Sequence, residues 1–217
     1  MTDEQTAVLT NAASFITALL SADAGGHDHF HAFRVEKTAA MLAKETGADE
    51  FTVRLAAVLH DADDRKLFPE TAGNQTHARY FLAENGVSPE KTEEILAVIR
   101  EVSFRGTDSV TPETAEGKCV QDADRLDALG ALGIARAFAY GGAHNRPLYD
   151  PAVPPVQNMD EKAYRANVSP TVNHFYEKLF LLKDALQTET ARRLAEERER
   201  FMRAFLEEFY AEWAGER

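Results

Sequence analysis

The chain has 217 residues, of which 24 are Lys or Arg and 36 are Asp or Glu, so its formal net charge is −12 at pH 7. A hydrophobic content of 44% is enough for one sizeable core and argues against intrinsic disorder. The negative charge, together with the lack of a Lys/Arg-rich run, argues against binding to a nucleic-acid polymer, and no apolar stretch is long enough to predict a membrane span.

The N-terminal residues and the cysteine content bear on the compartment and on metal binding. Residues 1–10 lack the positive start and the apolar run of a secretory signal, so we expect a cytoplasmic protein without a membrane partner. Cys119 is the one cysteine of the sequence, which excludes an internal disulfide and a cysteine zinc cluster. Any bound metal must therefore be held by His and carboxylate side chains.

Apolar residues recur at helical spacing and no run alternates with a period of two, which predicts an all-α fold. Gly25-Gly26 should end the first helical unit, and Gly47 should end the second. The expected helices cover roughly residues 2–22, 28–46, a segment after Asp49, 75–86, 89–104 and 112–140.

The stretch 141–170 contains five of the eight prolines and is expected to be one long loop of the kind that forms lids or binding surfaces. Two helices should then close the chain. Their predicted apolar faces are Phe175, Leu179, Leu182 and Leu186 on the first, and Leu194, Phe201, Phe205, Phe209 and Trp213 on the second. We therefore expect a single domain over residues 1–217, with a core at about 27–140 and C-terminal helices at about 171–215.

Two histidine positions place polar groups within this apolar pattern. His31 shares a helical stripe with Val35 and Leu42, so its imidazole should face the core. His60 and Asp61 follow the apolar run LAAVL, so at least one of the two should enter the core. An isolated inward His is more often a satisfied core residue than a ligand, which makes a convergence of several such groups the informative signal.

The segment QDADRLDALG adds a carboxylate to this set. Asp122 shares a stripe with Leu126 and Leu129, whereas Asp124 lies about 200° away on the helical wheel. Asp122 is therefore the acid of this segment that we expect to be buried. Since a buried charge must be paired or bound to metal, two imidazoles and two carboxylates that converge predict a divalent-metal site.

Other residues of these types have simpler expected roles. Asp28 precedes a predicted helix and should cap it. Cys119 should be a small buried hydrophobe. His77 could bind a second metal, but no further His lies between it and Asp122, so a second site would be short of imidazoles.

The order of these residues resembles that of the HD-domain metal-dependent phosphohydrolases. HDHFHAFRV is similar to the His-x-x-Arg-Val opening of that family, and AAVLHDADDRK is similar to its His-Asp core. DADRLDALGALGIARAF and NHFYEKLFLLKDALQTETA resemble a bacterial subgroup that acts on nucleotides. The resemblance covers roughly residues 27–215, and it implies an HD-domain-like helical bundle with a C-terminal helical extension.

The resemblance also implies one divalent metal ion with four ligands, which fall on His31, His60, Asp61 and Asp122. Mn, Mg, Co, Ni, Fe and Zn are not distinguished by these residues. Such an ion can lower the pKa of water and polarise a phosphoryl oxygen, so hydrolysis of a phosphate ester or anhydride is the expected reaction.

The same segments contain candidates for an acid–base residue and for phosphate contacts. Asp64 lies four residues after His60 and should face the same side if the helix persists, whereas Asp63 points elsewhere, so Asp64 is the expected catalytic residue. The expected phosphate contacts are the cations nearest to the ligands in sequence, with an ordinary salt-bridge role as the alternative for each: Lys66, Arg34 and Arg125. His174, Tyr176 and Lys178 could close over the site from the C-terminal helices.

These features predict a metal-dependent phosphohydrolase whose substrate is a small anionic molecule, with a nucleotide as the expected case. Either a nucleoside triphosphate is cleaved to monophosphate and pyrophosphate, or the phosphate of a monophosphate is removed. The alternative is a catalytically silent metal- or nucleotide-binding regulatory protein. An iron oxygenase would need a second metal with more His ligands than the chain supplies.

Overall fold

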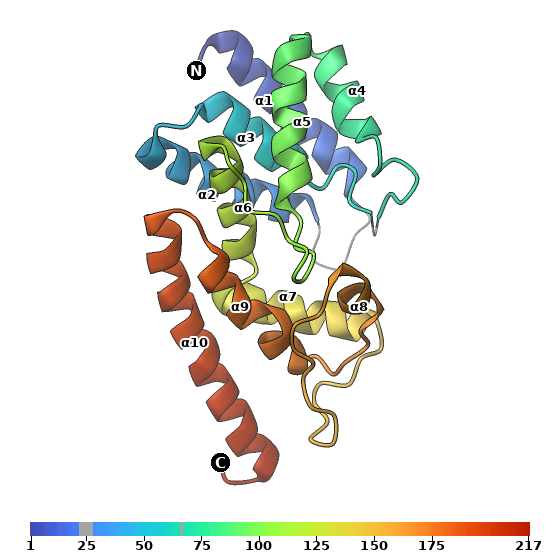
Figure 1. Ribbon diagram of the computed structural model, residues 1–217, viewed down its shortest axis with the longest axis vertical. Helices are drawn as coiled ribbons and strands as arrows, with labels where there is room; N and C mark the ends of the chain where they lie inside the picture. The colour runs from blue at the N-terminus through green and yellow to red at the C-terminus, as the bar shows by residue number, and fades with distance from the viewer. Residues whose placement is uncertain (22–27, 66) are drawn as a thin grey trace.

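The computed structural model describes residues 1–21, 28–65 and 67–217 (Figure 1). Within these ranges the regular elements are helices, apart from an isolated bridge between Arg105 and Thr107, so the all-α prediction is confirmed. No helix in the same ranges is both long enough and apolar enough to cross a membrane. Lys66 and the predicted helix end at Gly25-Gly26 lie outside the described residues.

The first half of the chain forms a bundle around α3. Eight of the ten α3 residues are buried, because α1, α2, α5 and α6 all pack against this helix. α2 lies between α3 and α6 and contacts both. The bundle consists of α1 (Asp3–Leu19), α2 (His29–Thr46), α3 (Glu50–Leu59), α4 (Thr76–Glu84), α5 (Pro89–Val102) and α6 (Ala115–Asp127).

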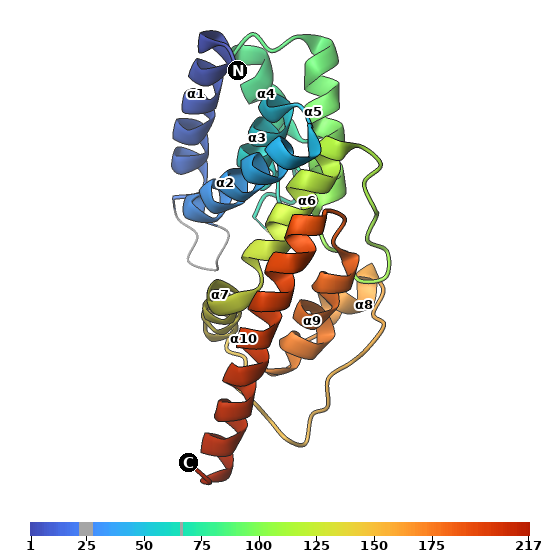
Figure 2. The same cartoon turned by 90° about the vertical axis from the view of Figure 1, so that its left-hand side faces the viewer.

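The second half of the chain forms a smaller layer below this bundle. Figure 2 shows the long helix α10 running from the bundle past α7 and α9 to the C-terminus, and α10 packs against both α6 and α7. The elements of this layer are α7 (Gly130–Ala143), α8 (Glu161–Ala166), a π-helical turn (Phe175–Leu179), α9 (Phe180–Leu182), a 3₁₀ turn (Lys183–Ala185) and α10 (Glu189–Ala214).

Several predicted boundaries differ from the structure. The helix expected over 112–140 is two helices, because Gly130 adopts a φ of 74° that residues with a side chain rarely adopt. The predicted loop 141–170 includes the end of α7 and the whole of α8. On α10, Phe205 packs beside Phe138, with ring centroids 5.9 Å apart, but Phe201 and Trp213 are each more than half exposed.

The loop after α5 approaches the segment before α8 closely at Gly106. Its φ is 61°, and a Cβ atom there would lie 2.1 Å from the carbonyl oxygen of Met159. The neighbouring Thr107 amide donates a hydrogen bond to that same oxygen at 2.9 Å. Gly106 therefore keeps the two segments in register.

Gly106→Ala should lower the free energy of unfolding by about 2 kcal/mol or more, because it combines an unfavourable φ with a backbone clash. Gly86→Ala is the matched control, since Gly86 has a φ of 69° but no neighbouring atom within 4 Å of the place where a Cβ atom would lie. It should cost about 1 kcal/mol, from the φ alone. Urea unfolding of both variants measures the difference, and equal losses would contradict the role given to the Met159 contact.

Candidate functional site

Two imidazoles meet where α2 begins and where α3 ends. His31 lies in the first turn of α2 and is fully buried, and Asp28 caps this helix by accepting from the His31 amide at 2.8 Å. His60 follows α3 directly, and its Nδ1 lies 2.8 Å from the carbonyl oxygen of Ala57. Because Nδ1–H donates to this carbonyl, Nε2 is the nitrogen of His60 that is available to a ligand, and the His60 ring centroid lies 5.1 Å from that of His31.

Two carboxylates complete the cluster. Asp61 Oδ2 lies 3.5 Å from His31 Nε2, and Asp61 Oδ1 lies 3.4 Å from His60 Nε2. Asp124 Oδ1, from α6, lies 3.3 Å from His31 Nε2 and 3.8 Å from His60 Nε2. Three distant segments thus bring two imidazole nitrogens and two carboxylates to one point.

This cluster fits a divalent metal ion. Ligand atoms of His31, His60 and Asp124 all lie within 4.8 Å of one another. The buried His60 Nε2 has no hydrogen-bond partner among the described residues, as expected of a nitrogen that binds a metal ion. Imidazole and carboxylate are together ligands for divalent transition metals. His31, His60, Asp61 and Asp124 are therefore the residues that would hold the ion.

Asp122, expected as the fourth ligand, lies elsewhere. It is fully buried as predicted, but its carboxylate accepts hydrogen bonds from the amides of Gln187 and Thr188 and from the Thr188 hydroxyl, at 2.7 to 3.0 Å. This carboxylate bonds the backbone just before α10. Since α6 is buried on more than one face, burial did not identify the face that points to the histidines, and Asp124 takes the place expected for Asp122.

Asp127, which sequence reasoning missed, holds His31 in position. Its Oδ2 accepts from His31 Nδ1 at 2.7 Å and from Arg136 at 2.8 Å, and Arg34 binds both of its oxygens. These contacts keep the pKa of the Asp127 carboxyl low, although burial opposes this. Asp124 and Asp127 lie three residues apart on one helical face. This spacing is visible in the sequence and could have identified both acids as residues of the site.

The protonation of His31 depends on the same two acids. Burial by itself lowers the pKa of His31, but hydrogen bonds to Asp124 and Asp127 outweigh it and raise the pKa to about 9. A metal ion at Nε2 would replace the proton held there.

The two acids after Asp61 have different surroundings. α3 ends at Leu59, and the chain continues in turns with amide bonds from Ala62 to Leu59 and from Asp64 to Asp61, so the helix does not persist as the spacing argument required. Asp64 nevertheless lines the same cavity as His60. Asp63 also lines it, but this residue is buried and its carboxylate accepts from the His77 and Ala78 amides at the start of α4.

The residues predicted to contact phosphate also differ in their surroundings. Arg34 pairs with Asp127 and does not line the cavity beside His60. It therefore acts through Asp127, the carboxylate that orients His31. Arg125 lines that cavity and donates to the carbonyl oxygen of Ala185. Lys66 lies outside the described residues. His77, considered for a second metal, bonds the carbonyl oxygen of Ala62 at 2.9 Å.

A cavity of about 460 Å³ opens beside the cluster, between the bundle and the C-terminal layer. His60 and Asp124 form part of its wall, together with residues of α7, α8 and the π-helical turn. Among the described residues, its lining includes seven arginines and one lysine, against five Asp and Glu residues. The cavity therefore favours an anion, although the chain as a whole carries a charge of −12. Of residues 174–178, His174, Glu177 and Lys178 line it.

Comparison with known proteins shows the family to which this chain belongs. The HD domain family matches residues 29–129, a range that contains His31, His60, Asp61, Asp124 and Asp127. YpgQ of Bacillus subtilis is 40% identical over 196 residues, which cover 89% of this chain and 87% of that protein.

Solved structures share the fold over nearly the whole chain. A protein from Lactobacillus plantarum has a TM-score of 0.84 at 37% identity, with 99% of both chains covered. An HD-superfamily hydrolase from Bacillus thuringiensis has a TM-score of 0.75 at 40% identity, covering 97% of this chain and 98% of that one. Bacillus subtilis YpgQ in complex with ADP has a TM-score of 0.75 at 33% identity, covering 94% and 97%.

The different surroundings of Asp122 and Asp124 predict opposite effects of the same substitution on one helix. Asp124→Asn should remove most of the bound metal, because it takes away a ligand charge. Asp122→Asn should keep the metal and lower the free energy of unfolding by about 1–3 kcal/mol, the scale for a disrupted buried hydrogen-bond group. Elemental analysis and urea unfolding separate the two, and full metal content in Asp124→Asn together with loss of metal in Asp122→Asn would return the ligand role to Asp122.

The raised pKa of His31 predicts that metal binding releases a proton. At pH 7 the imidazole of the metal-free protein is charged, since its pKa is about 9, and binding must displace the Nε2 proton. Apparent metal affinity should therefore fall about tenfold for each pH unit below 9. Calorimetric titration in buffers of different ionisation enthalpy measures the released proton, and an affinity that does not change between pH 7 and 9 would contradict the assignment.

Proposed function

Because this chain belongs to the HD-domain family, we propose that it is a metal-dependent phosphohydrolase that acts on a nucleotide. The observation that carries the proposal is the continuity of the candidate metal ligands His60 and Asp124 with a cavity lined by eight cationic side chains. Its volume of about 460 Å³ is within the range of small-molecule sites. The structure of Bacillus subtilis YpgQ in complex with ADP supports a nucleotide as the ligand class.

The residues of the cavity suit hydrolysis of a phosphate bond. A divalent ion, when bound, supplies Lewis acidity to a phosphoryl oxygen and lowers the pKa of water. The arginines neutralise the phosphate charge, and Arg125, one of the predicted phosphate contacts, lies in this wall. Asp64, on the same wall, is placed to orient the attacking water or to protonate the leaving oxygen.

Two reactions are open to this arrangement, and one experiment distinguishes them. The metal-loaded protein is incubated with nucleoside mono-, di- and triphosphates in the presence of Mn²⁺, Mg²⁺, Co²⁺ or Zn²⁺, and both phosphate and pyrophosphate are measured. Pyrophosphate with a monophosphate product identifies cleavage of a triphosphate, and phosphate alone identifies removal of a terminal group. Tight nucleotide binding without turnover would instead support the silent binding protein.

Asp64→Asn should bind metal and nucleotide but lose turnover by about 100-fold or more, the scale of an acid–base group. Asp63→Asn is the matched control, because the Asp63 carboxylate bonds the start of α4. It should lower the free energy of unfolding while the folded protein keeps its kcat. An equal loss of kcat in both variants, or near-normal turnover in Asp64→Asn, would remove Asp64 from the mechanism.

A further inference from the structure

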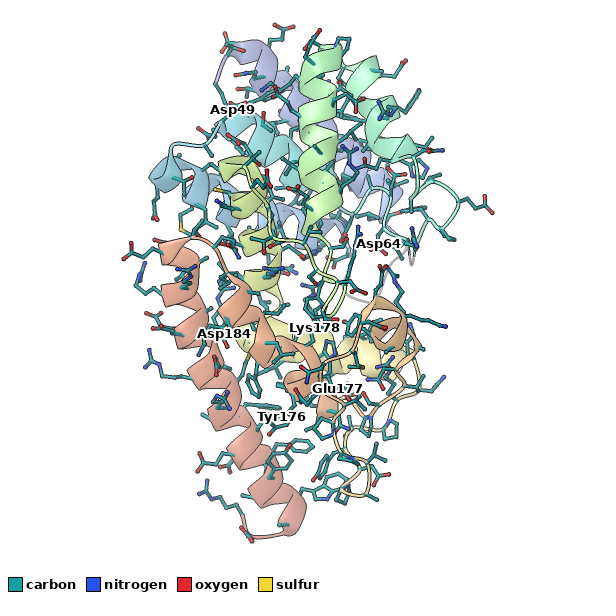
Figure 3. All side chains as sticks on the ribbon, viewed as in Figure 1. Asp49, Asp64, Tyr176, Glu177, Lys178 and Asp184 are labelled. Carbon is teal, nitrogen blue, oxygen red and sulfur yellow. The ribbon has the colours of Figure 1, made fainter. Side chains whose placement is uncertain are left out.

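Lys178 reaches the cavity from the C-terminal layer. It lies on the π-helical turn Phe175–Leu179 and lines the same cavity as His60 and Asp124. Figure 3 shows Lys178 on the segment below the N-terminal bundle, with Asp64 at the lower edge of that bundle. π-Helical turns are rare and often occur at functional sites, because the extra residue re-aims a side chain.

The surroundings of Lys178 are apolar on two sides. Its Nζ lies 5.2 Å from the ring centroid of Phe104 and 5.9 Å from that of Tyr164. Burial lowers the pKa of Lys178, and the nearby Arg136 and Arg125 lower it further, while the charges of Asp124 and Asp61 act in the opposite direction. In residues 1–21, 28–65 and 67–217, no carboxylate lies within ion-pair distance of this ammonium group.

The other cations of the cavity are engaged differently. Six of its seven arginines donate to a protein oxygen, for example Arg136 to Asp127 and Arg165 to Glu161, and Arg65 is exposed. Within the described chain, Lys178 is thus a half-buried cation of this wall that contacts aromatic rings but has no carboxylate or hydrogen-bond acceptor. Such a charge is costly unless a ligand supplies the missing anion.

The backbone that carries Lys178 is held firmly. Glu177 is buried, and its carboxylate accepts from the Val156 amide, from Asn167 Nδ2 and from the Ser169 hydroxyl. Phe175 and Leu179, on either side, belong to the hydrophobic core. The lysine is therefore positioned before any ligand arrives, which reduces the ordering cost of binding.

We propose that Lys178 is a phosphate-binding residue, whose ammonium group forms an ion pair with a phosphate oxygen of the substrate beside the candidate metal ligands. This inference rests on the proposed function and deepens it, since it assigns recognition of the phosphate chain to the C-terminal layer. The shared chemistry is a polyphosphate, so inorganic pyrophosphate and ADP serve as separate probes of the same group.

The test measures the affinity of the Mn²⁺-loaded protein for ADP and for inorganic pyrophosphate by calorimetry. Lys178→Met keeps the length of the side chain without its charge, and it should weaken both ligands by about 10- to 100-fold. Lys178→Arg should retain more affinity than Lys178→Met, because it restores the charge. Lys183→Met is the matched control on the same segment, since Lys183 pairs with Glu199 and does not line the cavity. It should bind both ligands as the unmodified protein does.

Stability without ligand gives a second readout that a merely structural lysine would not produce. Lys178→Met should unfold at the same temperature as the unmodified protein or at a higher one, because it removes a half-buried charge that has no ion-pair partner. Unchanged binding of both ligands by Lys178→Met would overturn the inference, and so would a loss of binding accompanied by a loss of stability or of metal.

The outcomes also separate this inference from the proposed function. If ADP binds equally well to the unmodified protein and to Lys178→Met, the nucleotide proposal stands and the role of Lys178 falls. If pyrophosphate binds in a manner that depends on Lys178 while ADP does not bind, the phosphate site stands and the nucleotide proposal falls. If the unmodified protein binds neither, both are overturned.

Discussion

The Asp127 carboxylate is the interaction on which the arrangement of the site depends. It accepts from His31 on α2, from Arg34 on the same helix and from Arg136 on α7, while it belongs itself to α6. One buried acid therefore connects three helices and orients the imidazole. A carboxylate behind a metal-binding histidine fixes the ring and raises its basicity, and its removal commonly weakens metal binding. The two arginines compensate the charge that this arrangement buries.

The sequence indicated the fold more completely than it indicated the site. Helical spacing of apolar residues identified the all-α class, because this spacing can be recognised within a short segment of the sequence. The break between α6 and α7 was missed, since it depends on one glycine with a positive φ at a position without an obvious loop composition. The short α8 was missed because its surroundings contain many prolines, which typically indicate a loop.

The buried acids show why residue roles were harder to predict. Asp63 and Asp122 are both buried, yet each bonds amides at the start of a distant helix, α4 and α10 respectively. Neither helix has a side-chain cap from its own N-cap residue. A helical wheel shows which side of a helix is covered, but not whether a metal or a backbone amide lies there. That distinction depends on contacts with other segments, which for Asp122 and Thr188 lie 66 residues apart in the sequence.

The bond between Asp122 and the start of α10 also has a consequence for the order of folding. Asp122 lies on the helix that carries Asp124 and Asp127, but the amides that satisfy its carboxylate are those of residues 187 and 188. If this carboxylate were buried before those amides bind it, a charge would lie in the core without hydrogen-bond donors, at a cost of several kcal/mol. The N-terminal bundle therefore closes fully around α6 only when the segment before α10 docks on it, so maturation of the site depends on docking of the C-terminal layer.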